Sequence, residues 1–203
     1  MEVRKNNIIT YRKYVVNRCD WVTDNEIYIE YHDKEWGVPV YDDRRLFEML
    51  ILEGVQAGLS WLTILKRRKT YRQAYDDFDP YKISKWNSAK INKLLNDKGI
   101  IRNKLKIEAA KINAQAYLKV VDEFGNFRKF IWSFVNEVPI QNSWKSLPEI
   151  PASTKKSDCM SKELKKRGFK FVGPTISYAF MQAVGMVNDH IISCFRHKEI
   201  KNL

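Results

Sequence analysis

Glu53 is an acidic residue at the end of an apolar run, residues 46–52. This run predicts a helix that is buried on most sides, where a charged carboxylate is costly unless it is hydrogen-bonded. Gly54, Gly58 and Trp61 follow, so a backbone bend and a flat ring lie close to the acid. The combination favours a pocket wall for a planar polar ligand. The alternative is that Glu53 caps a neighbouring helix and Trp61 is ordinary core.

Two cysteines and two histidines could form a metal site. Cys19 and His32 lie near one end of the chain. His190 and Cys194 lie near the other, four residues apart, which predicts that both occupy one face of a helix. Two thiolates and two imidazoles make a complete tetrahedral zinc set, structural because no position stays open. The alternative is that Cys194 is a small buried apolar residue and His32 a satisfied polar one.

A basic turn bounded by Gly168 and Gly173 joins two predicted helices. Ser157 is the expected N-cap of the first helix, and Pro174 begins the second, which runs to about residue 184. The outward-facing amides of the second helix could bind a DNA phosphate without reading sequence. The alternative is a helical hairpin whose lysines are merely solvated.

Composition limits the class of protein. The 203 residues are 44% hydrophobic, enough for a compact domain, and 36 basic against 24 acidic residues give a net charge of +12. That charge favours a polyanionic partner, either nucleic acid or an anionic membrane surface. No apolar run approaches the ~20 residues of a membrane span, and the N-terminus lacks a signal-peptide core. We therefore expect a cytoplasmic protein that is not inserted in a membrane.

Hydrophobic periods near 3.6 residues dominate, so the sequence predicts an all-α fold. Residues 1–17 are expected to be a flexible basic extension, and residues 18–203 to form the folded domain, which we expect to be monomeric. Residues 136–156 are the main expected loop. Helices are expected around Tyr28 and Tyr31, from Asp79-Pro80, over residues 43–52, 59–69, 88–99, 102–122, 127–135, 157–168 and 174–184, and from 189 onward. The alternative for residues 127–135 is a strand.

A basic surface, a phosphate-binding turn and an aromatic pocket with a buried acid together suggest chemistry on a nucleobase. Enzymes of this kind extrude the base from the duplex, stack it on aromatic rings and read its edge with a few polar groups. Glu53 would accept a hydrogen bond from an exocyclic amine or bind a cationic base. Trp61, Trp21 and the tyrosines would supply ring faces and hydroxyl groups.

Several long, dispersed segments resemble those of 3-methyladenine DNA glycosylase I, the Tag family, over about residues 18–196. These are Arg18-Cys19-x-Trp21-Val22, Tyr31-His32-Asp33-x-Glu35-Trp36-Gly37-Val38-Pro39, residues 52–61, residues 132–136, residues 165–173 and Val187-Asn188-Asp189-His190.

The resemblance implies a two-lobed helix-hairpin-helix fold, the motif itself at about residues 157–185, with a base pocket between the lobes. It also implies hydrolysis of the N-glycosidic bond of 3-methyladenine in double-stranded alkylated DNA, with free 3-methyladenine and an abasic site as products. No lysine is identifiable in the sequence as a Schiff-base nucleophile, so we expect a monofunctional enzyme with no strand-cleaving lyase step.

The family's functional residues fall on specific positions of this sequence. The resemblance implies one structural Zn²⁺ per chain, bound by Cys19, His32, His190 and Cys194. Glu53 is the implied base-binding acid and our candidate catalytic residue. Base-binding positions are Tyr31, Trp61, Trp21 and Tyr28, and Gly58 and Leu59 probe the gap left in the duplex. In the basic turn we expect DNA contacts from Lys166, Gly168, Lys170 and Gly173.

One position departs from the wider superfamily, which usually has a catalytic aspartate where this chain has Asn188. Tag-like enzymes share this absence, and a cationic 3-methyladenine leaves as a neutral molecule without prior protonation. The departure argues against Asp189 as the catalytic acid. The competing hypotheses are a non-catalytic, zinc-stabilised helix-hairpin-helix DNA-binding module and a small zinc-bound interaction protein.

Overall fold

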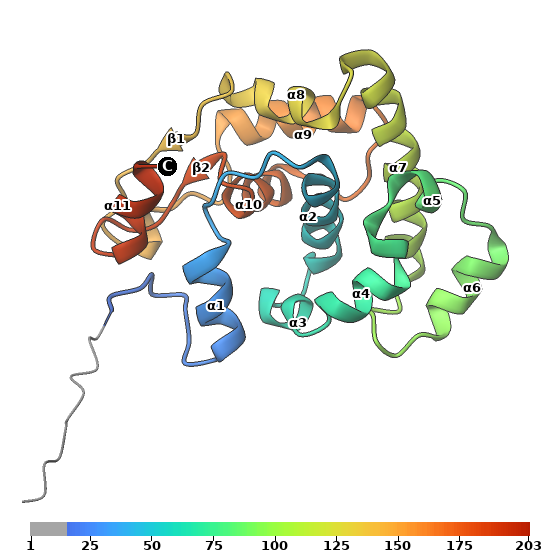
Figure 1. The fold of residues 1–203 in the computed structure, drawn as a ribbon, viewed down its shortest axis with the longest axis horizontal. Helices are drawn as coiled ribbons and strands as arrows, with labels where there is room; N and C mark the ends of the chain where they lie inside the picture. Colours follow the sequence, from blue (N-terminus) through green and yellow to red (C-terminus); the bar gives the residue numbers. More distant parts are fainter. Residues whose placement is uncertain (1–15) are drawn as a thin grey trace, which may run out of the picture.

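The computed structural model describes residues 16–203, so the expected extension, residues 1–17, lies almost wholly outside the described residues. The described chain is mainly helical, as predicted (Figure 1). A two-residue parallel pair, Ile140–Gln141 (β1) with Val187–Asn188 (β2), is the exception within this part of the chain. The helices are α1 (Glu26–Lys34), α2 (Asp43–Gln56), α3 (Trp61–Leu65), α4 (Arg68–Ala74), α5 (Pro80–Ile83), α6 (Ser88–Asn96), α7 (Lys104–Phe124), α8 (Phe127–Trp132), α9 (Lys155–Lys166), α10 (Pro174–Ala183) and α11 (Phe195–Lys201).

Short polar side chains begin most of these helices. Their oxygens accept hydrogen bonds from main-chain N–H groups of the first turn that have no partner inside the helix. The first turn of α9 differs from expectation, because Thr154 is the N-cap and Ser157 lies at the third helical position. The two side chains form a reciprocal capping box. The N-caps that accept in this way are Asn25, Asp42, Ser60, Asp79, Asn87, Asn103, Asn126 and Thr154.

Helix α2 is the centre of the molecule. Residues 46–55 are all buried, which accounts for the apolar run in the sequence. The helix packs against α3, α7, α8 and α10, and Figure 1 shows it surrounded by these elements. It continues through Gly54 to Gln56, past the predicted end, and a Cβ at Gly54 would lie 3.1 Å from that of Phe171. The close approach lets the turn before α10 pack directly on α2.

The predicted helix over residues 59–69 is two helices. The chain turns at Lys66 and Arg67, and α4 starts at Arg68. After the turn, the guanidinium of Arg68 points inward and donates to Glu48 (2.9 Å) and to Glu35 (2.8 Å). A continuous helix would not direct Arg68 to these two buried or half-buried carboxylates.

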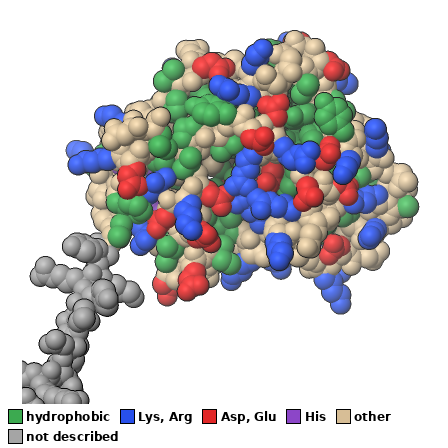
Figure 2. All heavy atoms as spheres, in the orientation of Figure 1, with side chains coloured by type: hydrophobic (Ala, Val, Ile, Leu, Met, Phe, Trp, Pro, Cys, Tyr) green, Lys and Arg blue, Asp and Glu red, His purple; other side chains and the backbone are tan. Residues whose placement is uncertain are grey.

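Glu48 is the centre of a cluster of ion pairs at the base of α2. It is buried and paired with Arg68, Arg45 and Arg72. Burial opposes ionisation, but the neighbouring guanidinium groups outweigh it, so the pKa of Glu48 is lowered. Glu35 pairs with two of the same arginines, which fixes the end of α1 to α2 and α4. Figure 2 shows acidic side chains interspersed among Lys and Arg side chains over this face of the molecule.

The end of α10 lies against the segment that follows α1. The N–H groups of Gly37 and Val40 donate to the main-chain oxygens of Gln182 and Val184, both at 3.0 Å. Gly185 has a φ of +70°, and a Cβ there would lie 2.3 Å from the carbonyl carbon of Val38. Only glycine allows this contact, which brings the chain after β2 beside α1. Among the described helices, none is long and apolar enough to cross a membrane.

Candidate functional site

A cavity of about 270 Å³ lies where α1, α2, α3 and α10 meet. Its walls are mainly aromatic and carry a few polar groups, which is the usual character of a site for a flat organic ligand. All five predicted base-binding and catalytic residues line it. The lining residues are Trp21, Tyr28, Tyr31, Trp36, Glu53, Gln56, Trp61, Leu147, Ile150, Ala179 and Gln182.

Glu53 occupies the last turn of α2 and is 4% exposed. No hydrogen bond to its carboxyl is formed by residues 16–203, and it is absent from the ion pairs of this part of the chain. Burial raises the pKa of Glu53 to about 8. An acid without a protein partner is available to a ligand, and a cationic ligand would favour its ionised form. The alternative in which Glu53 caps a neighbouring helix is wrong.

Tyr31 and Trp61 form one corner of the cavity, with ring centroids 5.5 Å apart. Both are buried. Burial, together with the nearby Glu53 carboxyl, raises the pKa of Tyr31 well above its ordinary value, so its hydroxyl stays protonated. The corner therefore presents a hydroxyl group and an indole ring next to the acid.

Trp21 lines the cavity beside Tyr31, with ring centroids 6.4 Å apart. Its ring lies 5.5 Å from that of Tyr28 and 5.1 Å from that of Trp36 between centroids, both edge to face. The indole nitrogens of Trp21 and Trp61 are buried and have no hydrogen-bond partner among the described residues. The hydroxyl of Tyr28 accepts from the N–H of Leu62 at 3.2 Å, so it also positions α3.

Gly58 and Leu59 form the turn between α2 and α3, at the rim of the cavity. Gly58 has a φ of +80° and Leu59, an apolar side chain, is 38% exposed. Two contacts stabilise the turn: the N–H of Leu59 donates to Gln56, and Lys106 donates to the carbonyl oxygens of Val55 (2.7 Å) and Ala57 (2.6 Å). The turn thus exposes the apolar side chain of Leu59, and these hydrogen bonds fix the main chain that carries it.

Residues 167–173 link α9 to α10. Lys166 and Lys170 are exposed, and no side chain caps the first turn of α10 at Gly173. Gly168 has a φ of +94°, and the space where a Cβ would lie is open. Asn113 of α7 fixes the turn, accepting from the N–H of Lys170 (2.7 Å) and donating to its carbonyl (3.0 Å). The amides of the turn are thereby held in one arrangement.

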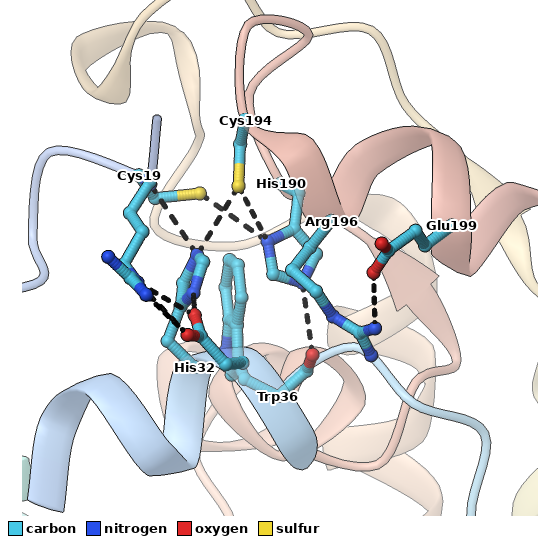
Figure 3. Close-up of polar contacts among 9 residues, drawn as sticks. Cys19, His32, Trp36, His190, Cys194, Arg196 and Glu199 are labelled. Atoms are coloured by element: carbon cyan, nitrogen blue, oxygen red, sulfur yellow. Dashed lines mark hydrogen bonds and ion pairs between the residues drawn. The ribbon is translucent and has the colours of Figure 1, made fainter. Parts of the chain in front are cut away.

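Cys19, His32, His190 and Cys194 come together in the buried interior, and their ligand atoms all lie within 4.8 Å of one another. Figure 3 shows the two thiols and two imidazole rings pointing toward one another. Cys194 Sγ lies 3.4 Å from His32 Nε2 and 3.6 Å from His190 Nδ1. With zinc–sulfur bonds of about 2.3 Å and zinc–nitrogen bonds of about 2.0 Å, tetrahedral geometry separates sulfur and nitrogen by about 3.5 Å. The donor set and its spacing fit zinc.

The second nitrogen of each imidazole has its own partner. Nδ1 of His32 lies 2.7 Å from Asp33, which Arg18 also binds, and Nε2 of His190 lies 3.0 Å from the carbonyl oxygen of Trp36. These acceptors leave the opposite nitrogens free for a metal, as is usual for zinc-binding histidines. Hydrogen bonds from Cys19 and the two imidazoles lower the pKa of Cys194 to about 2, toward the thiolate that zinc binds.

The local structure of this cluster differs from prediction. His190 and Cys194 do not share a helical face, because α11 begins only at Phe195 and Cys194 is its N-cap residue. A turn, in which the N–H of Cys194 donates to Ile191 at 2.8 Å, brings the two ligands together instead. The four-residue spacing correctly indicated that the two side chains are close, but a turn and not a helix brings them together.

Sequence reasoning assigned no role to two polar side chains of the cavity. Gln56 and Gln182 line it, and Asp189 lies just behind Gln182. Asp189 is not among the lining residues, and its carboxylate accepts four side-chain hydrogen bonds. The doubt about Asp189 as a catalytic acid agrees with this placement. Gln56 lies within the family segment of residues 52–61 but has no predicted role, and Gln182 lies outside the quoted segments, because its place at the cavity depends on how α10 packs against α2.

Comparison with known proteins gives one family. The profile of the methyladenine glycosylase family matches residues 21–197. DNA-3-methyladenine glycosylase 1 of Escherichia coli (strain K12) is 52% identical over 179 residues, covering 88% of this chain and 96% of that protein.

Solved structures agree with this result. A crystal structure of 3-methyladenine DNA glycosylase I (TAG) superposes with a TM-score of 0.86 and 52% identity, covering 88% of this chain and 98% of that one. A tyrosine-to-phenylalanine variant of such an enzyme, solved in complex with 3-methyladenine, superposes with a TM-score of 0.86 and 37% identity, over 89% and 97% of the two chains. The chain therefore belongs to the methyladenine glycosylase family of enzymes.

Proposed function

We propose that the protein is a monofunctional DNA glycosylase that extrudes 3-methyladenine from alkylated DNA and hydrolyses its N-glycosidic bond. The observation that carries the proposal is the buried, unpaired carboxyl of Glu53 in an aromatic cavity of base size. Such a group has no structural use, but it fits the amine or the positive charge of an alkylated adenine. The relatives named for this activity, and the one solved with 3-methyladenine, support the same substrate.

The aromatic walls would bind the extruded base by stacking. The rings that line the cavity are those of Trp21, Tyr28, Tyr31 and Trp61. Stacking and exclusion of water offset the cost of taking the base out of the duplex. The apolar tip at Leu59 would fill the gap that the base leaves. The side chain of Leu59 would thereby keep the duplex open while the reaction proceeds.

In the chemical step, water forms a bond to C1′ of the sugar, and the bond from C1′ to N9 of the base breaks. The bonding electrons go to the base, whose positive charge they neutralise, and the attacking water releases its proton to solvent. Ionised Glu53 would stabilise the positive charge that moves onto the sugar in the transition state. Binding the departing base more tightly than the intact nucleotide would supply the rest of the rate enhancement over the reaction in solution.

DNA would be held by a helix-hairpin-helix formed by α9, residues 167–173 and α10. The amides near Gly168 and Gly173 are the proposed phosphate donors, and Lys166 and Lys170 add positive charge. Asn113 holds the turn in place from α7. These contacts position the duplex without reading its sequence.

Zinc bound by the two cysteines and two histidines would have a structural role. Four protein ligands fill a tetrahedral site, so no position remains for water or substrate. The site joins the segment before α1 to the segment before α11, and His32 lies one residue after the pocket residue Tyr31. The ligands would therefore hold the aromatic wall of α1 over Glu53.

The proposal includes no lyase step, because no lysine lines the cavity within residues 16–203. We also propose that the enzyme acts as a monomer in the cytoplasm. A non-catalytic DNA-binding module would have the same basic turn but no need for an unpaired acid in the cavity.

Release of bases from methylated duplex DNA tests the proposal. The purified protein should release free 3-methyladenine, measured by chromatography, well above the spontaneous rate, and it should leave the strand uncut. Glu53→Gln should lower the rate about 10²-fold, as loss of one well-placed electrostatic group does. Release at the spontaneous rate by the unaltered protein would refute the function, and normal rates in both Glu53→Gln and Trp61→Ala would refute the pocket.

A further inference from the structure

Asp189 is a carboxylate that is 1% exposed and fully hydrogen-bonded. Its Oδ1 accepts from Asn142 Nδ2 (2.6 Å) and Trp144 Nε1 (2.8 Å). Its Oδ2 accepts from the hydroxyl of Tyr178 (2.6 Å) and from Gln182 Nε2 (2.7 Å). An ionised carboxylate has about four acceptor positions, and all of them are used here. Asp189 therefore fixes the orientation of each of these groups.

The consequence is greatest for Gln182, the one member of this cluster that lines the cavity. A carboxylate can only accept, so the side of the amide that faces Asp189 must be Nε2. The other branch, the carbonyl oxygen Oε1, is then directed away from Asp189. No hydrogen bond among residues 16–203 uses this oxygen. Because Gln182 lines the cavity and its Nε2 is used by Asp189, Oε1 is the branch of the amide left available to a ligand there.

We propose that Gln182 is a specificity-determining residue of the base pocket and that Asp189 is its positioning residue. Asp189 holds the amide so that Oε1 accepts from the exocyclic amine of the bound base. A base with a carbonyl group at the same place would put two acceptors against each other and leave both unpaired, which costs affinity. This inference rests on the proposed function, since it takes the cavity to be the base site.

Asp189→Asn provides a sharp test, because the surrounding donors dictate how the new amide must lie. The indole of Trp144 can only donate, so the remaining side-chain oxygen must stay beside Trp144. The new NH₂ group then faces Tyr178 and Gln182. The hydroxyl of Tyr178 can rotate to accept. Gln182 can accept only through Oε1, so its amide turns over and presents NH₂ to the cavity.

The experiment compares two free bases, 3-methyladenine and 3-methylhypoxanthine, in which a carbonyl replaces the exocyclic amine and a nitrogen of the imidazole ring carries a proton. The dissociation constants of the two bases are measured by titration calorimetry with the unaltered protein and with Asp189→Asn. The ring proton is the same for every variant, so the change in the ratio between variants reports on the amine position. We expect the unaltered protein to prefer 3-methyladenine, and the ratio of the two constants to fall about tenfold or to invert in the variant. An unchanged ratio in a folded variant of normal zinc content would overturn the inference.

Two further variants distinguish an effect of the Gln182 amide orientation from a general loss of stability. Gln182→Met removes the amide and should also lower the ratio about tenfold, so the inference stays testable if Asp189→Asn does not fold. Trp144→Phe removes one hydrogen bond to Asp189 on the side away from Gln182. It should lower stability and leave the ratio unchanged; a fall equal to that of Asp189→Asn would show that Asp189 merely stabilises the fold. Failure of the unaltered protein to bind 3-methyladenine would instead refute the proposed function.

Discussion

Nζ of Lys106, on α7, lies 2.6 Å from the carbonyl oxygen of Ala57, where α2 ends. It also donates to the carbonyl of Val55, so one ammonium group satisfies two carbonyls that have no partner inside the helix. The positive charge also suits the negative end of the helix dipole. This contact fixes the start of the turn that carries Leu59.

Replacing Lys106 should therefore impair action on DNA more than binding of a free base. In Lys106→Met the turn loses its anchor, and kcat/KM on duplex substrate should fall about tenfold through misplacement of Leu59. The dissociation constant for free 3-methyladenine should change little. Lys104→Met is the matched control, because Lys104 is exposed on the same helix. Equal losses in the two variants would indicate a general effect of charge.

Stability should depend on pH through Glu53. In the unfolded chain its carboxyl titrates near the ordinary pKa of 4.5, whereas burial raises the pKa of the folded state to about 8. Below pH 4.5 both states hold the proton and there is no penalty. Between these values the unfolded chain loses its proton first, so folding stability falls as pH rises, and above pH 8 the penalty is constant.

Glu53→Gln removes this penalty. Its free energy of unfolding, measured with denaturant, should match that of the unaltered protein near pH 4 and exceed it by a few kcal/mol at pH 8. Glu30→Gln, an exposed substitution, should give no such divergence. Parallel curves for Glu53→Gln and the unaltered protein across this range would contradict the raised pKa.

Loss of the metal should lower the stability of the fold more than it changes the rate of the chemical step. Chelation, or Cys194→Ser, should lower Tm by about 10 °C, because the binding free energy of a closed zinc site is folding free energy. Cys159→Ser is the control, since Cys159 is exposed and outside the ligand cluster. Metal analysis of the purified protein should give about one zinc per chain. A metal-free protein of unchanged Tm would exclude the site.

Two glycines separate the cost of backbone strain from that of a steric clash. Gly125 and Gly185 both have positive φ, but a Cβ at Gly125 would meet only Lys129 Nζ at 3.9 Å. Gly125→Ala should cost about 1 kcal/mol from backbone conformation alone. Gly185→Ala should cost several kcal/mol, because its Cβ would overlap the main chain of Val38 and Pro39. Unfolding curves of the two variants provide the comparison.

The sequence predicted the helices well where local signals agree. Pro174 was expected to begin a helix running to about residue 184, and α10 spans Pro174–Ala183, because proline suits the first helical position. It failed where tertiary contacts decide. The break between α3 and α4 depends on the pairing of Arg68 with Glu48, twenty residues away, and no local pattern encodes that partner.

The predicted site followed the same rule. The sequence indicated that Glu53 is buried beside aromatic rings and that Cys19, His32, His190 and Cys194 cluster, because a buried acid and a set of two thiols and two imidazoles are chemically specific. Gln182 could not be found, because its importance comes from Asp189, which faces it from the chain beyond α10. The amide and the acid become a functional pair only when the turn at Gly185 folds back.

The metal cluster also has a consequence for the order of events during synthesis. His190 is made 171 residues after Cys19, so a ribosome must release almost the whole described chain before the four donors can meet. Until then Cys19 and His32, the two donors of the early segment, have no partners. Joining them afterwards closes a very long loop, for which the entropy lost by the open chain is large. The cluster can therefore assemble only at the end of synthesis. In a chain arrested before residue 190, the metal ligands would not hold the aromatic wall of α1 over Glu53.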